Sequence, residues 1–304
     1  MHYTTHTPIL MQRRKQFRLK LPSMTLRLGE RTLIMGVLNV TPDSFSDGGK
    51  FLEQEQAIEH ALAMERAGAD LLDVGGESTR PGSEETSASE ELNRILPVLE
   101  GLRGRLKIPI SVDTRRSTVA ELAIRAGAQI INDVSGLCSD ARIAEVAARH
   151  HVPLILMHMR GDPRTMQKGP FARDVVKDVM QGLRKSVAKA RKAGVAKSQI
   201  ILDPGIGFGK SYAQNYELLE KLPLLAKLGY PLLVGTSRKG FLGATLAHDG
   251  KPALPEERLW GTAATLTVSI LNGAHIVRVH DVAEMVQVAR VTDCLLNPQQ
   301  RPRN

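Results

Sequence analysis

Several features that mark other protein classes are scarce in this chain of 304 residues. Aromatic side chains make up only 4% of it, which argues against a stacking platform for single-stranded nucleic acid. The two cysteines, Cys138 and Cys294, are too few for a disulfide framework or a CxxC metal site, so we expect unpaired thiols in a reducing cytoplasm. No apolar run approaches the roughly 20 residues that cross a bilayer, so no membrane partner is expected.

The formal net charge of +9 is unevenly distributed along the chain. Residues 1–31 carry a net charge of +6 and residues 301–304 a further +2, which leaves +1 for the body between them. A balanced body argues against nucleic acid as a partner. We therefore expect a basic, disordered extension over 1–23 without a signal-peptide core, one domain over 24–298, and a short basic tail over 299–304.

The body alternates short β-branched apolar runs with helical patterns. Eight runs are expected to be strands, because they are short and lack hydrophobic alternation, as parallel strands buried on both faces do. Between them lie helical patterns, and residues 172–193 place apolar side chains four apart on one face. The expected strands are Leu33–Leu38, Leu71–Val74, Ile108–Val112, Gln129–Ile131, Pro153–Met157, Ile200–Leu202, Pro231–Val234 and His275–Val279.

Eight strands that alternate with eight helices over about 270 residues favour an α/β fold of the (β/α)8 TIM barrel type. Residues 24–28 are expected to pair with the first barrel strand, as a short N-terminal β-hairpin that closes the barrel bottom. The alternative is a doubly wound open sheet, which requires a Gly-rich nucleotide turn after the first strand. That strand ends instead in Asn39-Val40-Thr41-Pro42, and no linker or composition break divides the body.

Polar or ionisable residues follow every expected strand. In a barrel of this type the chemistry lies at the C-terminal ends of the strands. One such residue alone would be explained as a helix N-cap, but a full set indicates a polar, charged pocket at the barrel top. The residues are Asn39, Asp73 with Glu77, Asp113, Asn132, His158, Asp203, Lys239, and Arg278 with His280.

Two long loops rich in Gly, Pro and Ser follow the first two strands, NVTPDSFSDGG and GGESTRPGSEETSAS. On a rigid barrel such loops are typically lids or binding loops, with plain surface connections as the alternative. The later segment DPGIGFGKS ends like a phosphate-binding P-loop. Pro204 stands where that pattern needs glycine, and the dinucleotide-binding spacing fails at Lys210, so both nucleotide interpretations are rejected.

The segment GTSRKG at 235–240 follows the seventh expected strand, close to where barrels often bind phosphate. Its Ser237, Arg238 and Lys239 suit an anion of some kind. The patterns of zinc proteases and of the α/β-hydrolase nucleophile, HExxH and GxSxG, are absent from the sequence.

Eight segments resemble the dihydropteroate synthase family in order and spacing: MGVLNVTPDSFSDGG, DVGGESTRPG, SVDT, INDVSG, MHM, DPGIGFGK, GTSRKGF and RVHD. The resemblance covers about residues 24–296. It implies a transferase on a (β/α)8 barrel that condenses (7,8-dihydropterin-6-yl)methyl diphosphate with 4-aminobenzoate to 7,8-dihydropteroate and diphosphate in folate biosynthesis. It also implies Mg2+ as cofactor, a cytoplasmic homodimer, and a target for sulfonamides.

The resemblance further implies roles for the residues at the strand ends and in the long loops. Asp113, Asn132, Asp203, Lys239 and Arg278 are expected to bind the pterin, and Asn39 to ligate Mg2+. Catalysis is expected from Asp113, Lys239, Arg278 and His280. Diphosphate is expected at Asn39, Thr79, Arg80, Arg278 and His280, and 4-aminobenzoate at Phe45, Pro81, Phe208, Ser237 and Lys239. This assignment makes the segment GTSRKG part of the pterin and 4-aminobenzoate sites, and not of a phosphate site.

Two other functions use a similar pterin pocket. A pterin-dependent methyltransferase of the methyltetrahydrofolate type lacks the paired loops NVTPDSFSDGG and STRPG, and this chain has both. A paralogue that binds pterin without turnover is the other alternative. The presence of Asn39, Arg80, Lys239, Arg278 and His280 argues against it.

Overall fold

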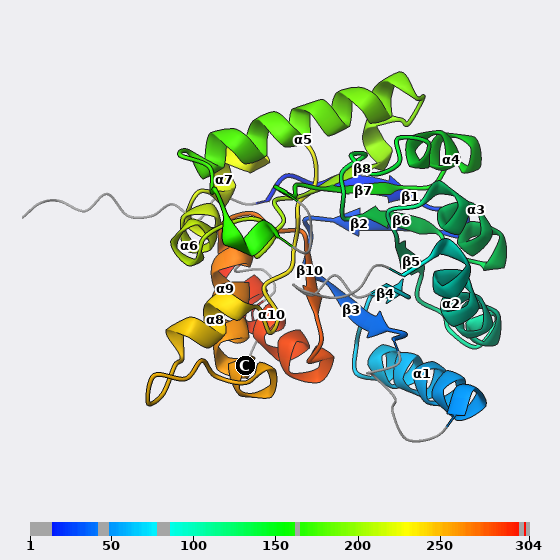
Figure 1. The fold of residues 1–304 in the computed structure, drawn as a ribbon, viewed down its shortest axis with the longest axis horizontal. Coiled ribbons are helices and arrows are strands. Elements are labelled where there is room, and N and C mark those ends of the chain that lie inside the picture. The colour runs from blue at the N-terminus through cyan, green and yellow to red at the C-terminus, as the bar shows by residue number, and fades with distance from the viewer. Residues whose placement is uncertain (1–13, 42–48, 78–85, 162–164, 298–300, 302–304) are drawn as a thin grey trace, which may run out of the picture.

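The chain folds into a barrel of parallel strands surrounded by helices (Figure 1). The computed structural model describes residues 14–41, 49–77, 86–161, 165–297 and 301. The eight barrel strands follow the order β8-β7-β6-β5-β4-β3-β10-β9, and a parallel bridge between Leu202 and Leu232 joins the two ends of the sheet. The (β/α)8 prediction is therefore confirmed. The strands are β3 (Leu33–Asn39), β4 (Leu71–Gly75), β5 (Ile110–Asp113), β6 (Ile130–Asp133), β7 (Leu154–Met157), β8 (Ile200–Asp203), β9 (Leu233–Val234) and β10 (Ile276–Val279).

Helices follow the strands and cover the outside of the barrel. The helical pattern over 172–193 becomes α5 (Val175–Lys192), and Ser87 forms the expected capping box with Glu90 at the start of α2 (Ala88–Leu102). Gly127 ends α3 (Ser117–Ala126) in the left-handed conformation, as a glycine C-cap does. The remaining helices are α1 (Gly49–Arg66), α4 (Ile143–His150), α6 (Tyr212–Glu220), α7 (Leu222–Ala226), α8 (Gly240–Thr245), α9 (Leu259–Leu271) and α10 (Val282–Leu296).

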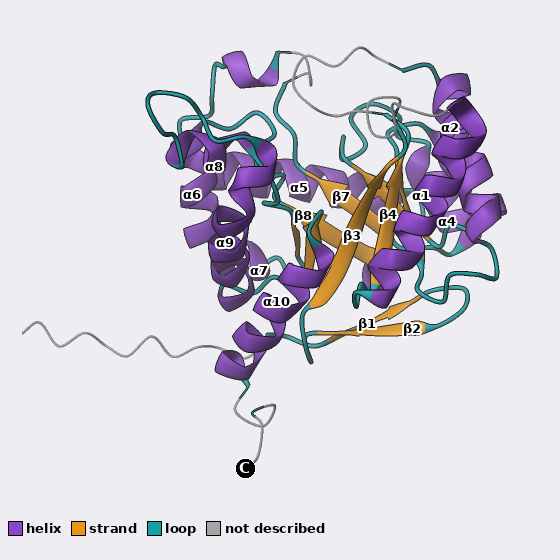
Figure 2. Ribbon diagram, turned by 90° about the horizontal axis from the view of Figure 1, so that it is seen from below, coloured by secondary structure: helices purple, strands orange, loops and turns teal. Residues whose placement is uncertain are grey.

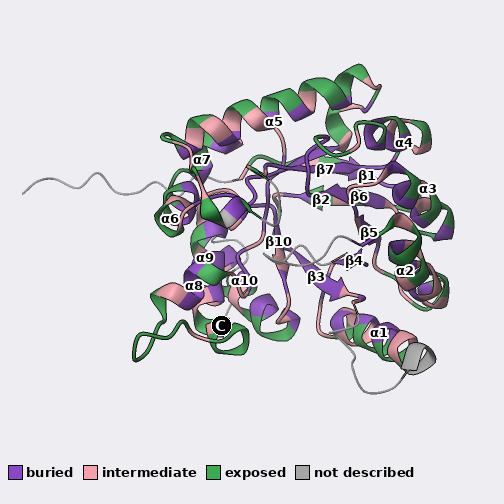
Figure 3. Ribbon diagram, viewed as in Figure 1, coloured by how far each residue is buried: buried purple, intermediate pink, exposed green. Residues whose placement is uncertain are grey.

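Each strand is buried on both faces, which explains why the strands read as continuous apolar runs. Side chains on the outer face, such as Leu72 and Ile131, pack against the helices in the main hydrophobic core. Side chains on the inner face, such as Leu71 and Ile130, form a second apolar cluster inside the lower barrel. Figure 3 shows the strands coloured as buried and the helices exposed only along their outer faces.

An antiparallel hairpin of β1 (Phe17–Lys20) and β2 (Thr25–Leu28) lies across the lower end of the barrel (Figure 2). The expected pairing of residues 24–28 with the first barrel strand is wrong, because β2 pairs with β1. Leu19, Leu21 and Leu28 are buried against the inner cluster of the barrel, so the hairpin does close the bottom. The expected disorder of residues 1–23 is therefore wrong for 14–23, while 1–13 lie outside the described residues.

The hairpin is held in place by the residues that precede it. The side chain of Arg14 is almost fully buried and pairs with Asp293 of α10 at 2.5 Å, and it also donates to the carbonyl oxygen of Ala274 at 2.9 Å. His275 faces the backbone of Lys15, with 2.9 Å between its Nε2 and the carbonyl oxygen.

Within the described ranges, no helix is both long and apolar enough to span a membrane.

Candidate active site

A polar layer lies directly above the apolar lower layer inside the barrel. Successive inward-facing residues of a strand are two positions apart, so one step along each strand leads from the apolar layer to the next. This step leads from Leu71 to Asp73 on β4 and from Ile130 to Asn132 on β6. It leads from Ile201 to Asp203 on β8 and from Ile276 to Arg278 on β10. The expected polar residues at the C-terminal ends of the strands thus form a layer of side chains that four different strands hold in place.

Arg278 is the centre of this polar layer. Its Nε lies 2.6 Å from Oδ2 of Asp73, and its second terminal nitrogen lies 2.9 Å from Oδ2 of Asp113. Asn132 donates its amide to the same Oδ2 of Asp73 at 2.9 Å. The structure therefore brings together Asp113, Asn132 and Arg278, as the sequence predicted, and adds Asp73 as the residue that joins Asn132 to Arg278.

Two acceptor atoms in this layer, Oδ1 of Asp73 and Oδ1 of Asn132, are buried and have no hydrogen-bond partner among the residues that the structure describes. Buried polar atoms in native proteins are nearly always hydrogen-bonded, so an unpartnered pair in a pocket calls for donors from a ligand or from water. Because the Asp73 carboxylate only accepts, it turns the amide nitrogen of Asn132 toward itself and leaves the oxygen of Asn132 to face a donor. This arrangement suits a heterocycle with N–H groups along one edge.

Burial perturbs the titration of the groups that line the pocket. It raises the pKa of Asp113, and the nearby Asp73 carboxylate raises it further. Burial raises the pKa of Asp203 to about 6 and lowers that of Lys239 to about 8, where the neighbouring charge of Arg278 also contributes. The pKa of His280 falls to about 3 because the ring is buried and next to Arg278. Clustered shifts of this kind are typical of functional sites.

The loop after β8 forms one wall of the pocket. Oδ1 of Asp203 accepts from the backbone N–H of Gly205 at 2.7 Å, which fixes the start of the loop on the strand end. The Phe208 ring faces the ammonium of Lys239, with 4.1 Å from Nζ to the ring centroid. A Cβ on Gly207 would lie 3.1 Å from Cδ of Lys239, so the loop backbone also contacts the lysine stem. These contacts give a flat, partly apolar surface beside a cation.

Ser237 and His280 come together at the ends of β9 and β10. Oγ of Ser237 is buried and accepts from the backbone N–H of His280 at 3.1 Å, and it lies 3.0 Å from Nδ1 of the His280 ring. Arg238 points to Asp281, with which it forms an ion pair, and is not directed into the polar layer. The loop GTSRKG therefore supplies Ser237 and Lys239 to the pocket.

Asn39 stands at the end of β3, half-buried. Among the described residues, no group of three or more His, Cys, Asp or Glu could hold a metal ion by itself. A single amide oxygen fits a hard cation such as Mg2+ only when other oxygen ligands arrive with the substrate or as water. Phe45, Thr79, Arg80 and Pro81 lie outside the described residues, so their predicted roles stay predictions.

Two residues received no role from the sequence. Asp73 appears among the strand-end residues, but only its contacts to Asn132 and Arg278 reveal what it does. Lys210 looks like the end of a failed P-loop in the sequence. In the fold it is fully buried, and its ammonium donates to backbone carbonyls of two loops. The sequence alone does not indicate the partners of Lys210, because they lie on two different loops.

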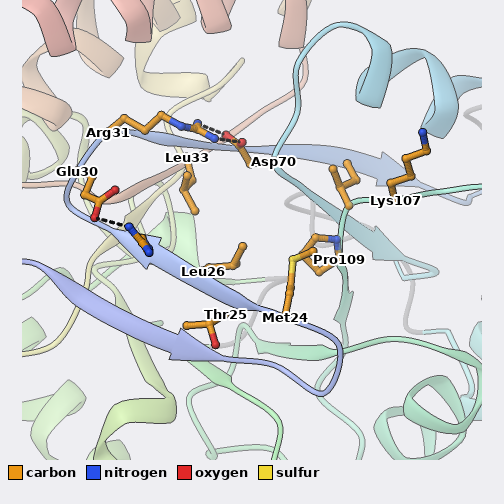
Figure 4. Close-up of a pocket in the computed structure, with 11 residues that line it drawn as sticks. Met24, Thr25, Leu26, Glu30, Arg31, Leu33, Asp70, Lys107 and Pro109 are labelled. Carbon is orange, nitrogen blue, oxygen red and sulfur yellow. Dashed lines mark hydrogen bonds and ion pairs between the residues drawn. The ribbon is translucent and has the colours of Figure 1, made fainter. Parts of the chain in front are cut away.

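A cavity of about 470 Å³ lies at the opposite end of the barrel, between β2 and the loops before β4 and β5 (Figure 4). Its floor is apolar, with Leu26, Leu33 and Pro109, and its arginine Arg31 is bound by Asp70 in a two-point ion pair. The unpartnered acceptors of Asp73 and Asn132, together with the shifted pKa values of Asp113, Asp203, Lys239 and His280, lie at the other end of the strands. We therefore assign the chemistry to the barrel top, as is usual for this fold.

Comparison with known proteins agrees with this site. The family described as "Pterin binding enzyme" matches residues 35–280, so the barrel and its polar layer define a pterin-binding enzyme. The chain is 51% identical over 267 residues to the dihydropteroate synthase of Synechocystis sp., a match that covers 88% of this chain and 91% of that protein. The chain belongs to the dihydropteroate synthase family, and it is a transferase of that class.

Solved structures of the family are also similar to this chain. The dihydropteroate synthase of Xanthomonas albilineans with 4-aminobenzoic acid has a TM-score of 0.86 and 42% identity, and the match covers 95% of this chain and 100% of that one. The Yersinia pestis dihydropteroate synthase in a sulfonamide drug complex has a TM-score of 0.84 and 42% identity, over 92% of this chain and 98% of that one.

Proposed function

We propose that this chain condenses (7,8-dihydropterin-6-yl)methyl diphosphate with 4-aminobenzoate to 7,8-dihydropteroate and diphosphate, and that sulfonamides inhibit it by occupying the aminobenzoate site. The observation that carries the proposal is the polar layer of Asp73, Asn132 and Asp203, which are buried, with Asp113 and Arg278, which are half-buried, joined at the barrel top by Lys239. Its unpartnered acceptors and adjoining cation match the alternating donors and acceptors of a pterin edge.

The pterin is expected to bind with its amino and N–H groups toward Asn132 and Asp203, and with its carbonyl toward the ammonium of Lys239. The unpartnered oxygen of Asn132 supports this orientation, because it would otherwise stay buried without a donor. A site built from buried hydrogen-bonding groups discriminates strongly against ligands that leave those groups unpaired. Asp113 lies next to Arg278 and provides negative charge near the ring.

Diphosphate departure requires stabilisation of the negative charge that develops on the leaving oxygen. Arg278 and His280, at the end of β10, are proposed for this role, and Thr79, Arg80 and Asn39 are proposed to share it. Asn39 would also hold Mg2+, which when bound neutralises charge on the diphosphate oxygens. The C–O bond of the pterinylmethyl group breaks with carbocation character, and the Asp113 carboxylate favours that positive charge.

The aminobenzoate nitrogen then attacks the methylene carbon. An aromatic amine is already neutral at pH 7, so no strong general base is required. The wall formed by Phe208 and the stem of Lys239 supports a site for the aromatic ring, and Ser237 is proposed to bind the carboxylate. Phe45 and Pro81 are proposed to complete this site.

We further propose a homodimer in the cytoplasm. Apolar side chains stand exposed on α9 and α10, with Trp260 at 77%, Val291 at 64% and Leu295 at 50% exposure, and these two helices lie side by side. Exposed apolar patches of this type mark interaction sites. Cys138 and Cys294 are not joined in a disulfide, which suits a reducing compartment. Light scattering on the wild type and on Val291→Glu would test the assembly.

The decisive experiment measures diphosphate release by the purified chain with the pterin diphosphate and Mg2+, with and without 4-aminobenzoate. Release that depends on aminobenzoate, together with dihydropteroate as product, is the expected result. Tight pterin binding without product would identify a non-catalytic pterin-binding protein and refute the proposal. A titration of Mg2+ against EDTA in the same assay tests the metal requirement separately.

A further inference from the structure

Lys210 is the second-to-last residue of the segment DPGIGFGKS and has no part in the chemistry described above. It lies between β8 and α6, and its side chain is only 1% exposed. Its ammonium lies 3.0 Å from Nδ1 of His158, 2.9 Å from the carbonyl oxygen of His158 and 3.0 Å from the carbonyl oxygen of Phe208. A lysine ammonium has three donors and here faces three acceptors, so no donor remains for a ligand.

These bonds join the loop that follows β7 to the loop that follows β8. The two backbones approach so closely that only glycine fits between them. A Cβ on Gly205 would lie 2.0 Å from the carbonyl oxygen of His158, and one on Gly209 would lie 2.0 Å from that of Arg160. Both glycines also have a positive φ, at 66° and 68°. The hydrogen bonds of Lys210 therefore join two loops whose backbones are already in contact. We expect them to restrict the loop after β8 to one conformation.

The contacts continue on both sides of Lys210. Toward the pocket, the ring of Phe208 faces the ammonium of Lys239 at 4.1 Å. Toward the outside, the ring of His158 lies against α5 at Gly182, where an added Cβ would be 2.4 Å from Cδ2 of the histidine. A continuous column of contacts thus runs from α5 through His158 and Lys210 to the Phe208 wall of the pocket.

We propose that Lys210 is a positioning residue for the arylamine substrate, which holds the Phe208 ring and the Lys239 stem at the spacing that a flat aromatic carboxylate needs. It acts through the carbonyl oxygen of Phe208 and through His158, without touching the substrate itself. The inference rests on the proposed function, since it names what the Phe208 wall binds. The pterin contacts of Asp113, Asn132 and Arg278 come from β5, β6 and β10, outside this column, so we expect the effect to fall mainly on the arylamine.

Lys210→Met keeps the length and volume of the side chain and removes the three hydrogen bonds. We expect the KM for 4-aminobenzoate and the inhibition constant of a sulfonamide to rise together by about tenfold, with the KM for the pterin diphosphate changed by less than about twofold. A merely structural role would instead lower stability and leave the two KM values in their original ratio.

Arg14→Met is the matched control. Arg14 is also a buried cation, with acceptors on Asp293, Thr32 and Ala274, but it lies at the lower end of the barrel. We expect this variant to lose stability in urea unfolding with both KM values unchanged. If Lys210→Met behaved like Arg14→Met, Lys210 would be a structural residue only and the inference would be overturned.

Two further variants test the route through Phe208. The double variant Lys210→Met with Phe208→Leu should raise the aminobenzoate KM by less than the product of the single effects, because residues that act through one contact are not additive. Gly182→Ala, at a helical position that favours alanine, should fold and push the His158 ring, with the same selective rise in KM. Additive effects in the double variant would overturn the inference. A wild type that releases no diphosphate would refute the proposed function instead.

Discussion

Asp73 gives the sharpest test of how the polar layer is held together. Its carboxylate is fully buried, and one oxygen accepts from both Arg278, at 2.6 Å, and Asn132, at 2.9 Å. The change Asp73→Asn keeps the shape of the side chain and removes its charge. Among the ion pairs of the described residues, the guanidinium of Arg278 then keeps the one with Asp113, at 2.9 Å.

The magnitude follows from the burial of the pair. Removing one partner of a buried ion pair costs about 3–5 kcal/mol of stability, because the other charge stays buried without compensation. Asp113 still pairs with Arg278 in the variant, so we expect the lower end, about 3 kcal/mol. An asparagine at this position also offers its own N–H2 to Asn132. That contact favours the opposite orientation of the Asn132 amide, so the affinity for the pterin should fall by about tenfold or more.

The variant should also change the pH dependence. Burial is the first cause that raises the pKa of Asp113, and the charge of Asp73 is the second. Without that charge the pKa of Asp113 falls. If ionised Asp113 is the active form, the loss of kcat/KM on acidification should move to lower pH in Asp73→Asn.

Equilibrium unfolding in urea at pH 7 measures the stability, and kcat/KM from pH 5 to 9 measures the shift. Lys221→Gln is the control, because it removes an ion pair with Glu220 on the protein surface, where such pairs contribute little. A double-mutant cycle with Arg278→Met should give a coupling energy of about 1–3 kcal/mol. If Asp73→Asn unfolded at the same urea concentration as Lys221→Gln, the reasoning on the buried pair would be refuted.

Three other predictions concern the ends of the barrel. Leu19→Ala removes a buried side chain from the hairpin and should lower the free energy of unfolding in urea by about 2–5 kcal/mol, with both KM values unchanged. An unchanged free energy of unfolding would mean that the hairpin does not close the barrel. The pKa of Lys239 is lowered to about 8 by burial and Arg278, so pterin affinity in calorimetry should fall as the pH rises through 8, and Lys239→Gln should abolish that dependence. Burial lowers the pKa of His275 to about 4, below the ordinary value of 6.5, so the unfolded chain binds more protons between these values. The stability that His275 contributes should therefore be complete above pH 6.5 and decrease toward pH 4, which the difference in urea midpoint between wild type and His275→Gln would show; a difference constant with pH would contradict it.

The barrel could be predicted from the sequence because parallel strands buried on both faces have a simple signature. Each of the eight apolar runs became a strand, and the residues after them, such as Asp113 and Asp203, became the polar layer. The argument worked because strand ends meet at one edge of the barrel regardless of the details of packing.

The hairpin at the barrel bottom was predicted, but its first strand, β1, was missed because charge was given more weight than alternation. Phe17, Leu19 and Leu21 alternate with Arg18 and Lys20, which is the pattern of a strand buried on one face. The basic side chains face solvent and the leucines face the barrel, so the same residues that suggested a loose tail form an ordered strand.

Contacts between distant segments could not be predicted from one sequence. Arg14 and Asp293 are 279 positions apart, and Lys210 finds its acceptors on two different loops. No local pattern encodes such pairs, because they depend on how the ends of separate strands and helices are placed. The roles of Phe45, Thr79, Arg80 and Pro81 stay predictions for a simpler reason, since these residues lie outside the described part of the chain.

The charges of the polar layer suggest how binding of the pterin ring and binding of the diphosphate depend on each other. In the described part of the polar layer, three carboxyl groups, on Asp73, Asp113 and Asp203, lie beside the cations Lys239 and Arg278, and the charge of Lys210 also acts on Asp203. Burying an uncompensated negative charge is costly, which is why the pKa of Asp113 and that of Asp203 are raised. A pterin that donates N–H groups to these carboxyls lowers that cost. It should then free Arg278 to turn part of its guanidinium toward the diphosphate. We therefore expect the pterin ring and the diphosphate to bind more tightly as one molecule than their separate affinities imply, because the ring supplies the donors that Arg278 gives up.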